Sequence, residues 1–337
     1  MKIKIIIAAF IFLLFSCSYF VFFRSADLSN ESLVKISIEN GMSARKIQSC
    51  LVEKNVLPRH SAFFIIIKVF RLENRIKAGT YAISPSETVV GIINKITRGQ
   101  TIPQEEIQVT FPEGTSIYKM GIILKKTGYK KWELFQGLAD EGITADLRQR
   151  HWGIFKYIPS ESLEGYLFPD TYRIYADASV EVLAEVMLGQ FEKIVVPYWN
   201  SVKNKTKLSL HETLTLASII EKEAKKPEER PIIASVFYNR LSIGMPLGAD
   251  PTVKYALERP TKRVLYSQLN VNSLYNTYKR KGLPPGPICN PGIASIKEAV
   301  NPAKTGYFFF VANKDGSHMF SRNWEEHQRA RLKATKK

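Results

Sequence analysis

A strand-turn-helix pattern that occurs twice constrains how the first half of this chain can fold. The two copies are Val34-Lys-Ile-Ser-Ile-Glu-Asn-Gly41-Met-Ser43 and Ile107-Gln-Val-Thr-Phe-Pro-Glu-Gly114-Thr-Ser116. Each has an alternating strand, a glycine turn and a serine that can cap a helix, and matched positions are 73 residues apart. Because two copies are too few for a solenoid, we expect a small module and a related element opening the next domain.

The segment between the copies completes the predicted module. Gly79–Ile83 is typical of a short strand, and residues 89–98 are typical of a helix that ends at Gly99. Residues 103–106 form a linker. We therefore predict an α+β protein with a module at 34–102, a connecting subdomain at 103–150 and a larger α+β domain at 151–337.

The N-terminal segment from Ile5 to Phe23 contains no charged residue. Its length at about 1.5 Å per residue matches a hydrocarbon core of roughly 30 Å, so residues 5–23 are predicted to be a transmembrane helix. Lys2 and Lys4 place the tail at 1–4 in the cytoplasm by the positive-inside rule. Residues 24–33 are then a linker, and the bulk of the chain lies outside the cytoplasm.

Two other interpretations of this segment were weighed. A cleaved signal peptide would have a shorter apolar region and a small-residue cleavage site, which is not found here. A lipoprotein signal needs small residues before the modified cysteine, and Phe15 precedes Ser16 and Cys17. The anchor is favoured, with lipidation of Cys17 as the second interpretation.

Charge and cysteine content exclude several classes of function. The net charge of +17 favours an anionic partner, and an extracytoplasmic location argues against nucleic acid. Cys50 and Cys289 outside the apolar segment are too few for a disulfide scaffold. No Cys or His spacing is typical of a metal site, so we predict neither metal nor cofactor.

Glu221 is the main candidate for a catalytic residue. Ser209 and Glu212 have the spacing of a capping box, which predicts a helix that starts there. Counting from that start, one helical face carries Leu210, Leu214, Ala217, Glu221 and Ala224. Burial disfavours a charged carboxylate and lets a glutamate donate a proton near neutral pH. The alternative is a helix-end glutamate paired with a nearby Lys or Arg, and spacing alone leaves both open. Glu223 points elsewhere on this helix.

Polar and aromatic residues elsewhere are candidates for binding a sugar. Glu164, Tyr166, Asp170 and Tyr172 combine acids with aromatic rings, as in the lining of a sugar-binding cleft, although this segment is equally compatible with core. Three further segments, rich in polar and rigid residues, are predicted to be stiff loops that keep other groups in position: Asp250–Thr252, Asn276–Tyr278 and Gly282–Ile288.

Seven segments of the second half of the chain form an ordered set of motifs: Glu164-Gly-Tyr-Leu-Phe-Pro-Asp-Thr-Tyr172, Ala217-Ser-Ile-Ile-Glu-Lys-Glu223, Ala234-Ser-Val-Phe-Tyr-Asn-Arg-Leu241, Asp250-Pro-Thr-Val253, Tyr275-Asn-Thr-Tyr278, Gly282-Leu-Pro-Pro-Gly-Pro-Ile288 and Asn290-Pro-Gly292. With these motifs, the chain resembles the endolytic murein transglycosylases of the MltG/YceG-like family. Each motif is weak alone, but seven in order are specific. Ser317-His-Met-Phe320 stands where members often carry Gly-His-x-Phe, which adds His318 as a candidate.

The resemblance implies a single-pass protein of the bacterial inner membrane with a LysM-like module and a periplasmic catalytic domain. Such enzymes cut nascent peptidoglycan strands between N-acetylmuramic acid and N-acetylglucosamine and leave 1,6-anhydro ends. The family's catalytic acid corresponds to Glu221, and peptidoglycan synthases are the implied partners. The family is thought to end strands as they are made.

A single acid is chemically sufficient for this reaction. Ordinary glycosidases need two carboxylates, but the C6 hydroxyl of the substrate can attack its own anomeric carbon, and one glutamate can act as acid and then base. We therefore expect an isolated Glu221. Four further residues either orient the sugar and stabilise developing positive charge on it or hold their loops together: Asp250, Asn276, Tyr278 and His318. The opposing hypothesis is a non-catalytic, membrane-anchored glycan-binding or scaffold protein in which Glu221 is structural.

Overall fold

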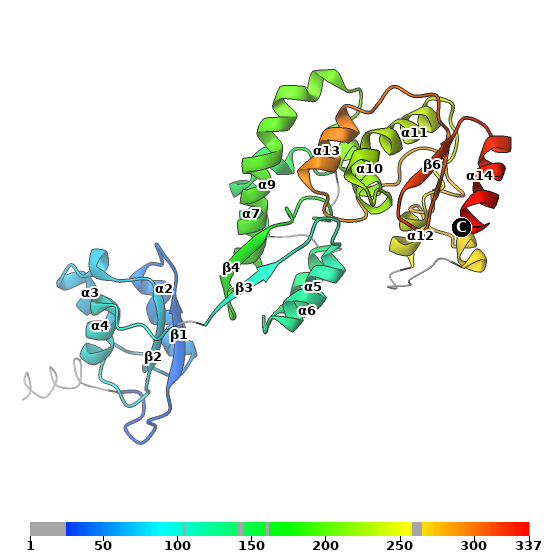
Figure 1. Cartoon of the computed structure of the whole chain (residues 1–337). Coiled ribbons are helices and arrows are strands. Elements are labelled where there is room, and N and C mark those ends of the chain that lie inside the picture. Colours follow the sequence, from blue (N-terminus) through cyan, green and yellow to red (C-terminus); the bar gives the residue numbers. More distant parts are fainter. Residues whose placement is uncertain (1–24, 104, 140–143, 160–161, 258–264, 337) are drawn as a thin grey trace, which may run out of the picture. The chain divides into compact units, whose positions relative to one another are not determined.

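The structure, a computed structural model, describes residues 25–103, 105–139, 144–159, 162–257 and 265–336 (Figure 1). The chain divides into two compact units, with the boundary between Gln104 and Glu105. Both mix helices with small two-stranded antiparallel sheets, and helices predominate. The predicted transmembrane segment at 5–23 and the tail before it lie outside the described residues. No helix within the described ranges is long and apolar enough to span a bilayer.

The first unit is built on one pair of strands. β1 (Val34–Ile38) runs antiparallel to β2 (Gly79–Ile83), with Ile36 opposite Tyr81. Its helices are α2 (Ala44–Glu53), α3 (Phe63–Val69), the short 3-10 helix η1 (Glu73–Arg75) and α4 (Val89–Arg98). Fully buried side chains from both strands and the helices form one core: Ile36, Ile47, Phe63, Tyr81 and Ile92.

Both copies of the strand-turn-helix pattern are present in the structure. In the second unit, β3 (Glu106–Thr110) leads through a turn into α5 (Ile117–Lys126). Ser43 and Ser116 each accept a hydrogen bond from the backbone N–H three residues later, as helix caps do. Gly41 and Gly114 have φ of 78° and 74°, a conformation that glycine adopts without strain.

The second unit contains two further strand pairings. β3 pairs with β4 (Thr171–Tyr175), and β5 (Phe309–Ala312) pairs with β6 (His318–Ser321). Its remaining helices are α6 (Trp132–Gln136), η2 (Gly137–Ala139), α7 (Ala145–Arg150), α8 (Trp152–Phe155), α9 (Val180–Val202), η3 (Lys203–Lys205), α10 (Leu210–Glu223), η4 (Pro227–Glu229), α11 (Arg230–Ser242), α12 (Asp250–Ala256), η5 (Tyr266–Asn270), α13 (Ile293–Val300) and α14 (Trp324–Lys336).

One predicted loop is a helix in the structure. Asp250–Thr252 forms the first turn of α12, so the sequence interpretation of this segment as a loop is wrong. Pro251 was the misleading signal, because proline is also well tolerated in the first turn of a helix, where its missing N–H would have no partner.

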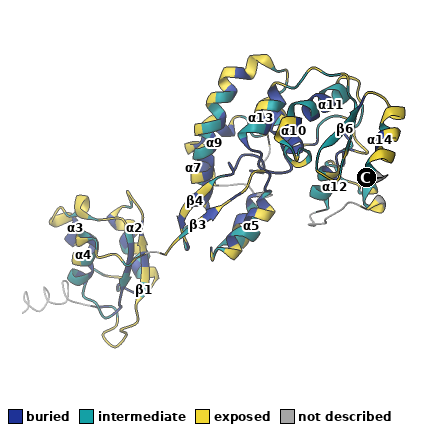
Figure 2. Ribbon diagram, viewed as in Figure 1, coloured by how far each residue is buried: buried dark blue, intermediate teal, exposed yellow. Residues whose placement is uncertain are grey.

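Helix α10 lies in the middle of the second unit, in contact with α11, α12 and α13. Ser209 and Glu212 form the predicted capping box at its start. Every residue from Thr213 to Ile220 is buried, so the helix is surrounded on all sides rather than along one stripe. Figure 2 shows the contrast with α14, where exposed residues dominate. Glu221 therefore extends from the end of a central, well-packed helix.

Candidate active site

Glu221 is the first acid beyond the buried part of α10, and its side chain is only 7% exposed. The backbone N–H of Gly292 donates a hydrogen bond to its Oε2 at 3.2 Å. Arg230 Nη2 lies 3.5 Å from Oε1. Each carboxylate oxygen therefore has its own partner, and the helix-end ion pair that the simpler interpretation anticipated is present.

The residue before Arg230 connects the start of α11 to β6. Glu229 accepts hydrogen bonds from the backbone N–H of His318 at 2.8 Å and is paired with His318 Nδ1 at 2.6 Å. The His318 side chain is 3% exposed. This contact ties the start of α11 to β6. His318 thus contacts Glu229, the residue that precedes Arg230, and Arg230 is the counterion of Glu221.

A second carboxyl, that of Glu113, lies beside Glu221. A Cβ built on Gly292 would overlap the Glu113 carboxyl, while the N–H of the same glycine binds Glu221. Partial burial raises the pKa of Glu113, the charge of Glu221 raises it further, and Arg230 lowers it. The expectation of an isolated Glu221 is therefore wrong, because the β3–α5 turn brings Glu113 to the same glycine from a distant part of the sequence.

The turn that carries Glu113 is fixed by three contacts. Gly114 donates its N–H to Asn290 O at 2.9 Å, and its own carbonyl accepts from Lys222 Nζ at 3.1 Å. Thr115 and Asn290 form an isolated antiparallel β-bridge. The turn is therefore anchored both to the end of α10 and to the segment before α13.

Glu164 connects the start of α5, which follows the Glu113 turn, to Asn290. Both of its carboxylate oxygens accept from the backbone N–H of Ile117, at 3.2 and 3.1 Å. Ile117 is the first residue of α5, and the N-terminus of a helix stabilises a negative charge. Asn290 Nδ2 donates to Glu164 Oε1 at 2.9 Å, and Asn290 Oδ1 accepts from the N–H groups of Gly165 and Leu167. Glu164 is 3% exposed. In this structure Glu164 holds the Glu113 turn and the Asn290 segment together.

The other residues of the aromatic segment face the protein interior. Tyr166 is fully buried, and its hydroxyl lies 2.8 Å from His211 Nδ1. Tyr172 is also buried and donates to Phe168 O at 2.6 Å. Asp170 accepts from Gln190 Nε2 at 2.7 Å. Burial raises the pKa of both tyrosines. Their proposed contact with sugar stays a prediction.

Asp250 and Tyr278, two further candidates, lie together. The hydroxyl of Tyr278 donates to Asp250 Oδ1 at 2.6 Å, and Tyr278 is 40% exposed. Asn276 is fully buried and its amide donates to the carbonyls of Leu269 and Val271, which fixes the loop. Burial raises the pKa of Glu223 to about 7, and the charge of Asp250 contributes to this increase. Since residues two apart point to different sides of a helix, this cluster and Glu221 flank opposite sides of the end of α10.

Comparisons with known proteins assign the chain to a family. The profile of the YceG-like family matches residues 36–333, which is most of the sequence. The chain belongs to the YceG-like family. An endolytic murein transglycosylase of Bacillus subtilis (strain 168) is 37% identical over 314 residues, which cover 91% of this chain and 86% of that protein.

Two other relatives are similar to most of this chain. An endolytic murein transglycosylase of Streptococcus pneumoniae (strain D39) is 31% identical over 327 residues, and the chain spans 58% of that protein. The 2.6 Å crystal structure of a YceG-like protein from Listeria monocytogenes is 35% identical and superimposes with a TM-score of 0.60, covering 89% of this chain and 99% of that one.

Sequence reasoning missed two members of this YceG-like site, Glu113 and Arg230. Glu113 was visible in the second copy of the repeat, where Pro112-Glu113 replaces Glu39-Asn40 of the first copy. That difference at otherwise matched turns was the available signal. Arg230 had none, because its proximity to Glu221 depends on how η4 turns the chain back towards α10.

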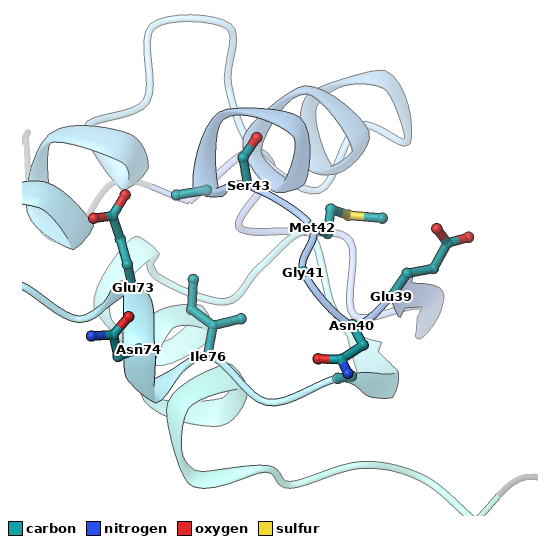
Figure 3. Close-up of a pocket in the computed structure, with 10 residues that line it drawn as sticks. Glu39, Asn40, Gly41, Met42, Ser43, Glu73, Asn74 and Ile76 are labelled. Carbon is teal, nitrogen blue, oxygen red and sulfur yellow. The ribbon is translucent and has the colours of Figure 1, made fainter. Parts of the chain in front are cut away.

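The first unit of the YceG-like chain has a pocket of about 320 Å³ beside the first copy of the same turn (Figure 3). Glu39, Asn40 and Gly41 line one side of it, and Glu73 and Asn74 line another. Among the described residues, no group of three or more His, Cys, Asp or Glu side chains converges as a metal site requires.

Proposed function

We propose that the protein is an endolytic lytic transglycosylase that cuts the β-1,4 bond between N-acetylmuramic acid and N-acetylglucosamine in nascent peptidoglycan strands. Glu221 is the general acid and base, and the products carry 1,6-anhydro ends. The observation that carries the proposal is that the Glu221 carboxyl is nearly buried and each of its oxygens has a separate fixed partner. The relatives named as endolytic murein transglycosylases support it.

The proposed reaction needs one proton-transferring group. Glu221 gives its proton to the glycosidic oxygen while the bond from that oxygen to the anomeric carbon breaks. The C6 hydroxyl of the same muramic acid then bonds to the anomeric carbon, and its proton passes to Glu221. Glu221 is then protonated again, as it was before the reaction, and can act on another glycosidic bond.

The contacts of Glu221 match the two halves of this cycle. After the proton has left, the carboxylate is stabilised by the charge of Arg230 and by the N–H of Gly292. Both partners stand at helix starts, Arg230 at that of α11, next to the Glu229–His318 contact, and Gly292 at that of α13. Little reorganisation is then needed as charge develops.

The remaining parts of the chain fit an enzyme held next to growing glycan. We propose that residues 5–23 anchor it in the cytoplasmic membrane with the catalytic unit outside, and that the first unit is a LysM-like module whose pocket binds glycan. The net charge of +17 suits an anionic membrane surface. Peptidoglycan synthases are the proposed partners, because the enzyme would end strands as they are made.

Replacement of Glu221 tests the catalytic assignment. E221Q keeps the size of the side chain but cannot give up a proton in the required way, so cleavage of purified glycan strands should fall by at least about a hundredfold. E228Q is the matched control, since Glu228 is an exposed carboxyl in the nearby η4. This control should cut as the unmodified chain does. A folded E221Q protein that still cuts would overturn the assignment.

Mass spectrometry of the products separates the candidate functions. Anhydro ends support the transglycosylase. Hydrated reducing ends would show that water attacks instead, as in a muramidase, which the second carboxyl of Glu113 makes geometrically reasonable. Strands that are bound but uncut would indicate a glycan-binding or scaffold protein.

A further inference from the structure

We propose that Glu113 is a positioning residue for the proton on Glu221. The two carboxyls approach the backbone of Gly292 together, and the negative charge of Glu113 opposes that of Arg230 at the place where Glu221 must hold a proton before each cut. This inference rests on the function proposed for Glu221.

The positions of two glycines show how closely the groups are packed. Gly292 donates its N–H to Glu221 and has no space for a Cβ, because the Glu113 carboxyl fills it. Gly114, the residue after Glu113, lies against Glu221 itself, and a Cβ there would be 3.1 Å from Glu221 Cγ. The Glu113–Gly114 backbone therefore packs directly on the side chain of Glu221.

Exposure differs between the two carboxyls. Glu113 is exposed at the residue level, whereas the Glu221 side chain is 7% exposed. Glu113 thus lies nearer to solvent than Glu221 does.

The surrounding charges make this role specific. Arg230 acts on both carboxyls and also lowers the pKa of Glu298 on α13. Lys222 is occupied by the carbonyl of Gly114. The buried thiol of Cys289 and the amine of Lys119 complete the group, and burial raises the pKa of the first and lowers that of the second. In this group, Glu113 is the carboxyl that lies against Gly292, and the charge of Glu221 raises its pKa.

The expected consequence concerns the pH profile of cleavage. Cleavage needs a proton on Glu221, so the rate falls on the alkaline side. A neighbouring negative charge helps the carboxyl to keep that proton, and a neighbouring arginine favours its loss. Removing the charge of Glu113 takes away one of the negative charges that oppose Arg230 beside Glu221, and the alkaline limb should therefore move to lower pH.

The test compares rate–pH profiles of glycan-strand cleavage for the purified full chain and its variants. E113Q keeps the size of the side chain, and we expect its alkaline limb to shift down by about half a pH unit, since Glu113 is partly screened by water. E228Q is the matched control, because it removes the charge of an exposed carboxyl in η4. Its limb should not move.

A second variant tests the geometry independently. G292A places a methyl group where the Glu113 carboxyl lies, while the backbone angle of Gly292, φ −74°, suits alanine. The carboxyl must then turn away, and the limb should shift as in E113Q. The double variant should shift no further than either single one, since both remove the same interaction.

Three outcomes would overturn the inference. One is an E113Q profile that is scaled in rate but unchanged in shape, which is what a purely structural role predicts. Another is additive shifts in the double variant. If E113Q fails to fold or to cut, E113D decides, because it keeps the charge and its alkaline limb should stay where it is in the unmodified chain. A limb that moves to lower pH in E113D would then count against the proposal. An active E221Q protein would instead reject the proposed function itself, so the two failures are distinguishable.

Discussion

Gly114 lies directly against the side chain of Glu221: a Cβ on this glycine would be 3.1 Å from Glu221 Cγ. The contact joins the turn after β3 to the end of α10, two segments about a hundred residues apart in sequence. Because Gly114 also has a φ of 74°, both its backbone conformation and its lack of a side chain are required. The turn that was recognised as a repeat is therefore one wall of the candidate active site.

Substitution of Gly114 should reduce cleavage, whereas substitution of the matching Gly41 in the first copy should not. G114A forces a strained backbone and a close contact with Glu221, so we expect the second unit to lose about 1–2 kcal/mol of stability and cleavage to fall at least tenfold. The measurements are thermal unfolding and the rate of glycan-strand cutting.

G41A in the first copy is the control. Gly41 has a similar φ of 78°, but nothing lies within 4 Å of a Cβ built there. The same backbone strain should arise without any effect on the chemistry, and the cleavage rate per folded molecule should stay unchanged. Equal loss of cleavage in both variants would show that the contact with Glu221 is not what matters.

The sequence predicted the local structure around the site well, because local structure depends on nearby residues. The capping box of Ser209 and Glu212 fixed the start of α10, and Ser116 with Gly114 fixed the turn into α5. Each of these features depends on residues within about two turns of one another. Helical spacing placed Glu221 on one apolar face with Leu214 and Ala217, whereas in the structure α10 is buried on all sides up to Ile220.

Contacts between distant segments could not be predicted in the same way. That Glu113 and Gly292 meet beside Glu221 follows from how three separate segments dock through Asn290, and no periodicity encodes this docking. The prediction of a loop at Asp250 failed for a different reason, since Pro251 is compatible with both a turn and a helix start. Buried polar residues such as Glu164 were singled out by composition, but their partners became visible only in the fold.

His318 offers a test between a structural and a sugar-binding role. In H318A the carboxylate of Glu229 loses its side-chain partner in a nearly buried position and keeps the backbone N–H of residue 318, so the free energy of unfolding should fall by about 2 kcal/mol. Arg230 follows Glu229 directly, and kcat should therefore decrease while KM stays within about twofold. Steady-state kinetics on glycan strands together with urea unfolding measure both effects.

H318Q distinguishes the alternatives further. Glutamine retains an N–H donor that can reach Glu229, so part of the stability and of kcat should return. A large increase in KM in both variants, with stability near that of the unmodified chain, would instead indicate that His318 contacts the glycan, as the sequence motif predicted.

Glu223 should make the stability of the second unit depend on pH in a defined direction. Its pKa is raised from the ordinary 4.5 to about 7 in the folded protein, first by burial and then by Asp250. The folded state therefore binds this proton more tightly than the unfolded state does. The sign follows from linkage: stability is highest below pH 4.5 and decreases as pH rises towards 7.

Replacing Glu223 with glutamine should remove this dependence. Glu223 is half-buried, so we expect E223Q to be more stable than the unmodified chain by about 2 kcal/mol at pH 8 and nearly equal to it at pH 4.5. Urea unfolding at the two pH values gives the difference, in which contributions from other groups with raised pKa, such as Glu113, cancel. E228Q, which changes an exposed carboxyl, should follow the unmodified chain at both pH values. A gain in E223Q that is the same at pH 4.5 and pH 8 would show that titration of Glu223 is not its source, since only a proton lost between these values makes the gain pH-dependent.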